Sequence, residues 1–176
     1  MGCMSTNKLS MRLWPRLWRH WTHPRQRVSM YFPILARQQL TEQIARSEQR
    51  HTGQLRFVIE SSLNTACLCH HVTARQRAQY WFGQLGVWDT AEKSGILVYV
   101  LFADRAVEII ADRGINACVD MTMWQQICNH ITQAFQQQNY MAGLSGGLDE
   151  LTELLAQHFP RIHAGVNELE DEVILK

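Results

Sequence analysis

The chain has 176 residues, a formal net charge of +1 at pH 7, and 46% hydrophobic against 19% charged residues. This length and composition suit one domain with a sizeable buried core. No apolar run of about 18 residues occurs, and the amino-terminal region lacks the continuous apolar segment of a signal peptide, so the sequence predicts neither a membrane span nor Sec export. We therefore expect a cytoplasmic protein, and the small net charge requires no nucleic-acid partner.

Residues 1–32 are a basic, tryptophan-rich arm. The first 41 residues contain seven Lys or Arg and no acidic residue. The tryptophans are spaced four and three residues apart, as on one face of a helix, and they alternate with arginines. The residues concerned are Arg12, Trp14, Arg16, Trp18, Arg19 and Trp21. We expect a short or broken helix bounded by Pro15 and Pro24.

Three kinds of partner suit this arm. Tryptophan beside arginine is typical of a segment that lies in a membrane interface, which would place the arm on the inner-membrane surface or against a membrane protein. In a second interpretation the tryptophans pack the arm onto its own domain or onto a partner, with the arginines in solvent. Stacking on single-stranded nucleic acid is the third and least favoured alternative.

From residue 33 onward apolar residues recur with regular periods, and residues 33–160 predict one α/β domain. The expected helices cover 33–51, 73–85, 120–137 and 144–158, and the expected strands cover 55–60, 96–101 and 107–111. Residues 61–72 predict an irregular loop, and the glycines between 143 and 147 predict a turn before the last helix. Residues 161–176 form an acidic carboxyl-terminal tail.

The order of these elements predicts a small mixed sheet. Strand, helix and strand between residues 55 and 101 form a βαβ unit, so the two strands should be parallel with a right-handed crossover. The third strand then returns antiparallel, as the second half of a hairpin. Strand 96–101 is apolar throughout, as expected of a strand covered on both faces, whereas strand 107–111 contains Glu108 and suits a sheet edge.

These directions gather charged residues at two opposite ends of the sheet. The hairpin turn with Asp104 and Arg105 lies at the same end as the 61–72 loop. The other end holds a richer set, which consists of Asp89, Glu92, Lys93, Ser94, Asp112 and Arg113. An arginine among carboxylates can hold a phosphate and a metal ion, but the same residue types also form ordinary surface ion pairs.

Five cysteines occur at irregular spacings, and their odd number favours reduced thiols over a disulfide framework. They are Cys3, Cys67, Cys69, Cys118 and Cys128. Two of them lie beside His70 and His71, so this loop offers soft metal ligands. Because the sequence has no distant second pair of ligands, an ordinary loop is favoured over a zinc or copper site.

The sequence resembles the TPM domain family from Ile34 to Pro160. The resemblance rests on the start of the hairpin, its turn, its second strand with a glycine turn, and an aromatic and glycine pattern around the last two helices. These motifs are Gly95-Ile96-Leu97, Asp104-Arg105, Glu108-Ile109-Ile110, Arg113-Gly114, Trp124, Phe135 and Asn139-Tyr140-Met141-Ala142-Gly143-Leu144. The resemblance implies an α/β/α sandwich around a small mixed β-sheet, made of a βαβ unit plus a hairpin, with flanking helices.

The resemblance also implies possible chemistry. Related proteins of the thylakoid lumen are described as acid phosphatases, many bacterial members are membrane-tethered without an assigned activity, and some members bind divalent cations. Carried onto this sequence, that implies Ca²⁺ or Mg²⁺ at Asp89 and Asp112, with Arg113 beside them. The family's Asp-Asn-Gly before the hairpin is Lys93-Ser94-Gly95 here, which removes one oxygen ligand and adds a positive charge. No other cofactor and no defined small-molecule substrate are indicated.

Two functions follow from the sequence. The favoured one is a TPM-domain protein of unassigned activity that serves as a membrane-associated accessory or interaction module, peripheral at the cytoplasmic face of the inner membrane. The alternative is a divalent-metal-dependent phosphatase that uses Asp89, Asp112 and Arg113.

Overall fold

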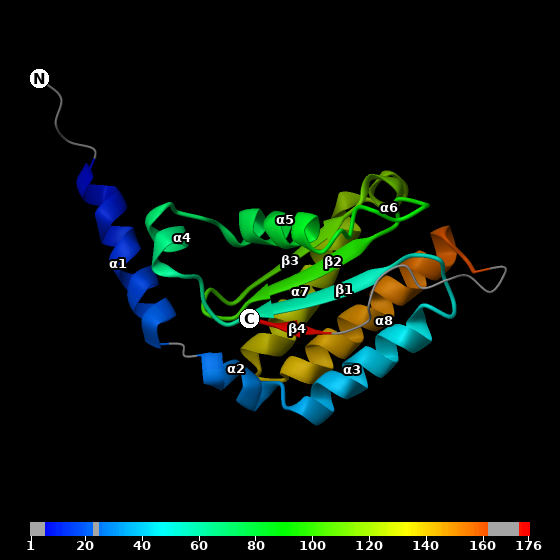
Figure 1. Cartoon of the computed structure of the whole chain (residues 1–176), viewed down its shortest axis with the longest axis horizontal. Coiled ribbons are helices and arrows are strands. Elements are labelled where there is room, and N and C mark those ends of the chain that lie inside the picture. Colours follow the sequence, from blue (N-terminus) through cyan, green and yellow to red (C-terminus); the bar gives the residue numbers. More distant parts are fainter. Residues whose placement is uncertain (1–5, 23–24, 162–172) are drawn as a thin grey trace, which may run out of the picture.

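The computed structural model describes residues 6–22, 25–161 and 173–176, with side chains described at 14–22, 28–161 and 173–176. Figure 1 shows three layers, with α5 on one side of the sheet and α3 and α8 on the other. The elements in chain order are α1 (Thr6–Thr22), α2 (Arg25–Tyr31), α3 (Ile34–Ser47), β1 (Leu55–Glu60), α4 (Thr65–Cys69), α5 (Ala74–Gln84), β2 (Ile96–Leu101), β3 (Ala106–Ala111), α6 (Arg113–Cys118), α7 (Met121–Gln136), α8 (Tyr140–His158) and β4 (Ile174–Leu175). The α/β/α sandwich around a mixed sheet is therefore confirmed.

The sheet has the order β3-β2-β1-β4. Strand β1 pairs in parallel with β2, from Leu55 opposite Ile96 to Glu60 opposite Leu101, and β2 pairs antiparallel with β3. Every residue of β2 is buried, whereas β3 lies at the edge and is half-buried over much of its length. The predicted βαβ unit, hairpin and edge strand are thus confirmed.

Alternate residues of the strands enter two hydrophobic cores, as the period of two in a strand requires. Phe57, Ile59 and Val98 belong to the larger core, which also contains apolar residues of α3, α7 and α8. Val58 and Tyr99 point to the other face and pack with residues of α5 and of the α4 region. Two covered faces explain why β1 and β2 are buried along their whole length.

The amino-terminal region and the 61–72 segment contain more helix than the sequence predicts. Helix α1 continues through Pro15, which was expected to bound a broken helix, and α2 was not anticipated. Proline lacks an N–H group and weakens a helix interior. The contacts of α1 with the domain that are described below all come from residues after Pro15. Segment 61–72 contains the short helix α4, whose first turn is capped by the Asn64 side chain accepting from Cys67 N at 2.8 Å.

Helix α8 begins at Tyr140, so the glycine cluster lies inside the helix and does not form the predicted turn. The reason is close packing against α7. A Cβ atom at Gly147 would lie 2.6 Å from Ile131 Cδ1, and one at Gly143 would lie 2.8 Å from Ala134 Cβ. Glycine is accepted inside α8 because it lets the two helix backbones approach each other.

The carboxyl-terminal tail also contributes to the sheet. Strand β4 pairs in parallel with β1, with Val58 opposite Ile174, and Val173 is buried in the larger core. This short apolar strand was not predicted, because the acidic composition of residues 161–176 indicated a tail. Residues 162–172, which precede it, lie outside the described part of the chain.

Two neighbouring glycines of α8 provide a test of the α7–α8 packing. Gly147→Ala should lower the free energy of unfolding by about 1–3 kcal/mol, because the new methyl group overlaps Ile131. Gly146→Ala is the matched control, because nothing lies within 4 Å of a Cβ at that position. It should raise stability by up to about 1 kcal/mol through helix propensity. Urea unfolding measures both; equal effects of the two variants would contradict this packing.

Candidate functional site

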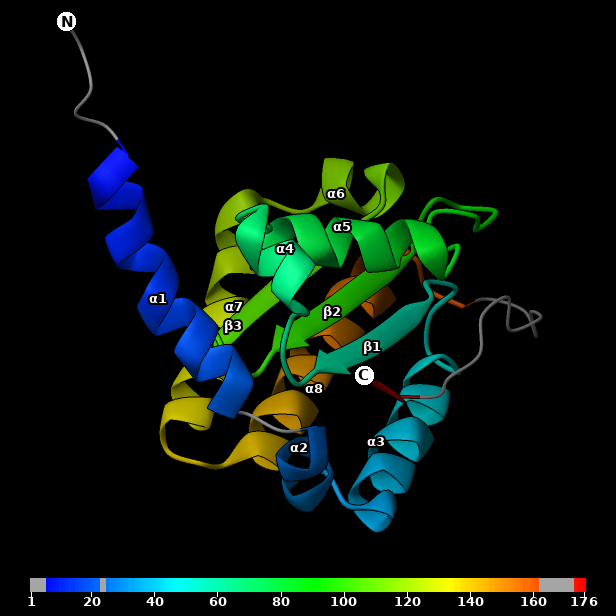
Figure 2. The same ribbon diagram turned by 60° about the vertical axis from the view of Figure 1, so that its left-hand side comes forward.

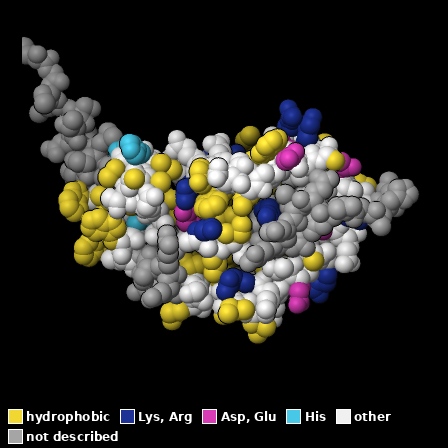
Figure 3. Space-filling model, viewed as in Figure 1, with side chains coloured by type: hydrophobic (Ala, Val, Ile, Leu, Met, Phe, Trp, Pro, Cys, Tyr) yellow, Lys and Arg dark blue, Asp and Glu magenta, His cyan; other side chains and the backbone are white. Residues whose placement is uncertain are grey.

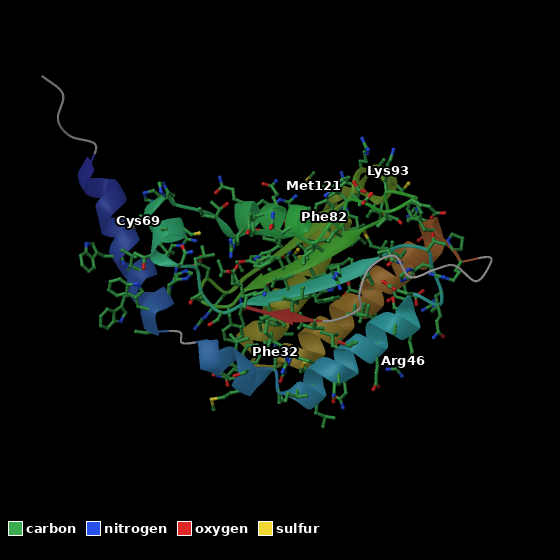
Figure 4. The ribbon with its side chains drawn as sticks, in the orientation of Figure 1. Phe32, Arg46, Cys69, Phe82, Lys93 and Met121 are labelled. Atoms are coloured by element: carbon green, nitrogen blue, oxygen red, sulfur yellow. The ribbon has the colours of Figure 1, made fainter. Side chains whose placement is uncertain are left out.

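The strand directions create two candidate sites at opposite ends of the sheet, as the sequence predicted. We call the end with Ser94 and Asp112 the amino end, because β2 begins there, and the end with Asp104 and Arg105 the carboxyl end. Figure 4 shows them far apart, with Lys93 labelled near one end of the molecule and Cys69 near the other.

At the amino end, Asp112 has a structural role. Its Oδ1 accepts a hydrogen bond from Arg113 N at 2.7 Å and so caps α6, and its own N–H donates to Gly95 O at 2.8 Å. Its second oxygen, Oδ2, is buried without a hydrogen-bond partner among the described residues, and so is Ser94 Oγ. A buried oxygen without a partner is a position where water or a ligand could bind.

The other predicted residues of this end do not join Asp112. Glu92 accepts a hydrogen bond from the Thr52 hydroxyl, and Asp89 and Arg113 are exposed. The carbonyl of Lys93 accepts from the N–H groups of Gly114 and Ile115, which ties the preceding loop to α6. The predicted residues therefore share one end of the sheet without converging on one point.

The described residues do not fit the divalent-cation site that the family resemblance implies. Hard cations take six or more oxygen ligands, usually from several carboxylates. Within residues 6–22, 25–161 and 173–176, no group of three His, Cys, Asp or Glu side chains lies close enough to hold a metal ion. Asp112 offers one free carboxylate oxygen, and Asp89 is not brought to it by any observed contact.

At the carboxyl end, Asp104 is the anchor of α1. Its Oδ2 accepts from Arg16 Nη2 at 2.7 Å and from Arg16 Nε at 3.0 Å, and its Oδ1 accepts from Arg19 Nη2 at 3.1 Å. Arg16 also donates to Val72 O at 2.8 Å. Figure 2 shows the result, with α1 running alongside α4 at this end of the domain. Arg12 belongs to α1 as well, but its side chain lies outside the described residues.

His20 completes this anchor in one defined tautomer. The backbone N–H of Leu63 donates to His20 Nδ1 at 2.9 Å, so Nδ1 carries no proton. The proton of the neutral ring is therefore on Nε2, which lies 3.1 Å from Asp104 Oδ1 and donates to it. The His20 ring is buried, so this contact joins α1 to the hairpin turn and to the loop after β1 at once.

The environment of Asp104 keeps its carboxylate ionised. Burial alone would raise its pKa, but the hydrogen bonds from His20 and Arg16 outweigh burial and lower the pKa to about 2. Only 14% of this side chain is exposed, so solvent screens the pairing with Arg16 less than it would on an open surface. The interaction persists across the whole physiological pH range.

The contacts between α1 and Asp104 determine the orientation of the tryptophans of α1. Trp14, Trp18 and Trp21 are 69%, 67% and 61% exposed. The interpretation that the tryptophans pack the arm onto its own domain with the arginines in solvent is therefore wrong, because Arg16 and Arg19 contact the domain instead. Figure 3 shows hydrophobic side chains gathered on the outer side of this helix.

The carboxyl end contains a second buried carboxylate, which was not predicted from the sequence. Glu60, the last residue of β1, accepts two hydrogen bonds from Arg77, at 2.7 and 2.8 Å. It also accepts from Tyr99 Oη at 2.7 Å and from Trp81 Nε1 at 3.2 Å. Burial opposes the charge of Glu60, but these donors together lower its pKa below the ordinary value. These donors lie on α5 and β2, so the network fixes α5 on the sheet.

In the cysteine and histidine loop, the described side chains do not form a group of three or more metal ligands. Cys69, His70 and His71 are exposed, and Cys67 is half-buried in α4. The cysteines for which side chains are described, Cys67, Cys69, Cys118 and Cys128, are free thiols, as predicted. Cys3 lies outside the described residues.

Comparison with known proteins supports the fold. The family model described as the TPM domain matches residues 34–154. The NMR structure of the BA42 protein from the psychrophilic bacterium Bizionia argentinensis is 26% identical and has a TM-score of 0.71; the alignment covers 80% of this chain and 92% of that one. The amino-terminal domain of a P. gingivalis protein shares the fold at 20% identity, with a TM-score of 0.54 and coverage of 69% and 76%. No curated protein matches the chain.

Proposed function

This chain belongs to the TPM domain family, and from that premise we propose that it is a membrane-associated accessory module, which attaches to an anionic membrane surface through the tryptophans of α1. The observation that carries the proposal is the orientation of that helix. The side chains of Trp14, Trp18 and Trp21 lie on the solvent-exposed face of α1. On the opposite face, Arg16 and His20 contact Asp104 of the domain.

The tryptophan row has the chemistry of an interfacial segment. Tryptophan prefers the boundary between headgroups and acyl chains, where its ring is apolar and its N–H can still be hydrogen-bonded. Spacings of four and three residues place the three rings on one side of the helix. A single exposed tryptophan needs no explanation, but three in one row at more than 60% exposure form an apolar strip.

The proposal describes a peripheral protein. No helix in the described part of the chain is long and apolar enough to cross a membrane. A strip of rings inserted at headgroup depth gives reversible attachment, with the domain beside the surface. Arg19, whose side chain is 55% exposed while it contacts Asp104, can add attraction to anionic lipids. We place this surface at the cytoplasmic face of the inner membrane, in keeping with the expected cytoplasmic location.

Vesicle sedimentation tests the attachment. The full chain should pellet with vesicles of phosphatidylcholine and phosphatidylglycerol, and the triple variant Trp14→Ser, Trp18→Ser, Trp21→Ser should bind at least about 100-fold more weakly, because each ring contributes on the order of tenfold. Trp88→Ser is the matched control, since Trp88 is 55% exposed at the amino end of the sheet and should not contribute.

Three results bear on this proposal. Loss of pelleting in the triple variant alone supports it. Equal pelleting of the parent and the triple variant would contradict the role of the tryptophans, and absence of pelleting in the parent would contradict membrane attachment itself. Circular dichroism of the variants should match the parent, because the three rings are exposed and do not support the core.

A second candidate function is a phosphatase at the amino end. It is favoured by the buried Asp112 Oδ2, which lacks a hydrogen-bond partner among the described residues, and by the neighbouring Arg113, which can bind a phosphate. The described carboxylates do not assemble a cation site there, so we rank this function below membrane attachment.

Hydrolysis of p-nitrophenyl phosphate, with and without Mg²⁺ or Ca²⁺, tests the second function. If this end is catalytic, Arg113→Ala and Asp112→Asn should each lower turnover at least about 100-fold. Cys69→Ser is a control at the opposite end, where Cys69 is exposed, and should keep full activity. Turnover that persists in both variants would assign any phosphatase activity to another place.

A further inference from the structure

A cavity of about 380 Å³ opens at the carboxyl end of β2, and membrane attachment makes no use of it. Its size is that of a small-molecule site. Ligands of open α/β sheets commonly bind outside the carboxyl ends of parallel strands, which is where this cavity lies. Its main lining residues come from α2, the hairpin turn, the end of α7 and the start of α8; they are Tyr31, Phe102, Arg105, Phe135, Gln138 and Tyr140.

The walls of the cavity are flat aromatic rings. Tyr31 stacks on Phe102 with ring centroids 5.3 Å apart and an interplanar angle of 23°. Tyr140 lies 4.8 Å from Tyr31 and 5.2 Å from Phe135 between centroids. Phe32, labelled in Figure 4, packs at the rear of this cluster against Phe102. These rings pack on one another and together form an aromatic wall, against which a flat apolar body can lie.

Two polar residues of the lining adopt a backbone conformation that favours glycine. Arg105, in the hairpin turn, has a φ of 52°, and Gln138, which follows the end of α7, has a φ of 63°. Glycine takes these angles without steric cost, whereas other residues are strained there. Both positions nevertheless carry long polar side chains, and both side chains line the same cavity. Strain of this kind collects at ligand sites.

The charges around the cavity favour an anion. Asp104, beside Arg105 in the turn, is already paired with Arg16 and Arg19, so it does not neutralise the Arg105 guanidinium. Arg105 makes no ion pair within the described residues, and no acidic residue is among those that line the cavity. Helix α8 begins at Tyr140 without a side-chain cap or an acidic residue in its first turn, which adds partial positive charge.

We propose that this cavity is a binding site for a small organic anion, a carboxylate or phosphate carried on a flat apolar body. The anion pairs with the Arg105 guanidinium and accepts a hydrogen bond from the Gln138 amide, while the body lies against the rings of Tyr31, Phe102 and Tyr140. The site is independent of membrane attachment, and no vesicle is needed to test it.

Titration of the full chain with naphthalene-2-carboxylate and 1-naphthyl phosphate, followed by amide chemical shifts, tests the site. For ligands of this size we expect dissociation constants on the order of 1 mM. Shifts should concentrate on residues 102–105 and 135–140, and the stronger of the two ligands identifies the preferred anion. The neutral isostere naphthalene-2-carboxamide should bind about tenfold more weakly, because it cannot form a charged pair with Arg105.

Glycine variants separate binding from folding. Arg105→Gly and Gln138→Gly remove the side chains and also relieve the backbone strain, so their urea midpoints should equal or exceed that of the parent. Arg105→Gly should nevertheless weaken binding about tenfold, and Gln138→Gly should weaken it severalfold. Lys93→Gly is the matched control, since Lys93 has a φ of 55° at the opposite end of the sheet and should leave binding unchanged.

The outcomes are decisive. Undiminished binding in Arg105→Gly, equal affinity for the carboxamide, or shifts that map away from the cavity would each overturn the proposal. Weaker binding in Arg105→Gly at unchanged or higher stability, with Lys93→Gly behaving as the parent, would establish Arg105 as the anion ligand.

Discussion

The pairing of Asp104 with Arg16, Arg19 and His20 is the contact on which both of the proposed binding surfaces depend. One carboxylate in a hairpin turn accepts hydrogen bonds from three side chains of α1 and fixes that helix on the domain. Proline weakens the interior of α1, and the contact holds the part of the helix after Pro15 on the domain. Because Asp104 and Arg16 are largely shielded from solvent, their pairing is worth more than that of an exposed ion pair.

The contact between Asp104 and α1 has two consequences, one for the tryptophans of α1 and one for Arg105. The arginines turn inward to Asp104, so the tryptophans of α1 are turned outward as an apolar strip. The same arginines pair with Asp104, and the neighbouring Arg105, which has no ion pair among the residues that the structure describes, lines an aromatic cavity. The arginines of α1 therefore determine both the orientation of the exposed tryptophans and the pairing of the carboxylate beside Arg105. The amino end of the sheet is organised by backbone contacts of Ser94, Gly95 and Asp112 instead.

The sheet could be predicted from the sequence because its signals are local. An apolar strand, a helix, a second apolar strand and a short turn determine the parallel and antiparallel pairings, and these fix which charged residues share an end. The partners of Asp104 could not be predicted, since Arg16 is 88 residues away and no local pattern connects the two. Glu60 was missed for a similar reason, because it ends an otherwise apolar strand and its donors Arg77 and Tyr99 lie on other elements. The turn predicted at the glycines of α8 was wrong because Gly143 and Gly147 pack against α7, which the sequence of α8 alone does not reveal.

A double-mutant cycle on Arg16→Ala and Asp104→Ala tests whether the Arg16–Asp104 pair holds α1 on the domain. Urea unfolding of the parent, the two single variants and the double variant gives the coupling free energy between the two side chains. We predict a favourable coupling of about 1 kcal/mol or more, as expected of a charge-assisted pair that is largely shielded from solvent. The exposed pair Arg50 and Glu153 serves as a control cycle and should be close to additive. Additive effects at Arg16 and Asp104 as well would contradict the view that this contact holds α1 in place.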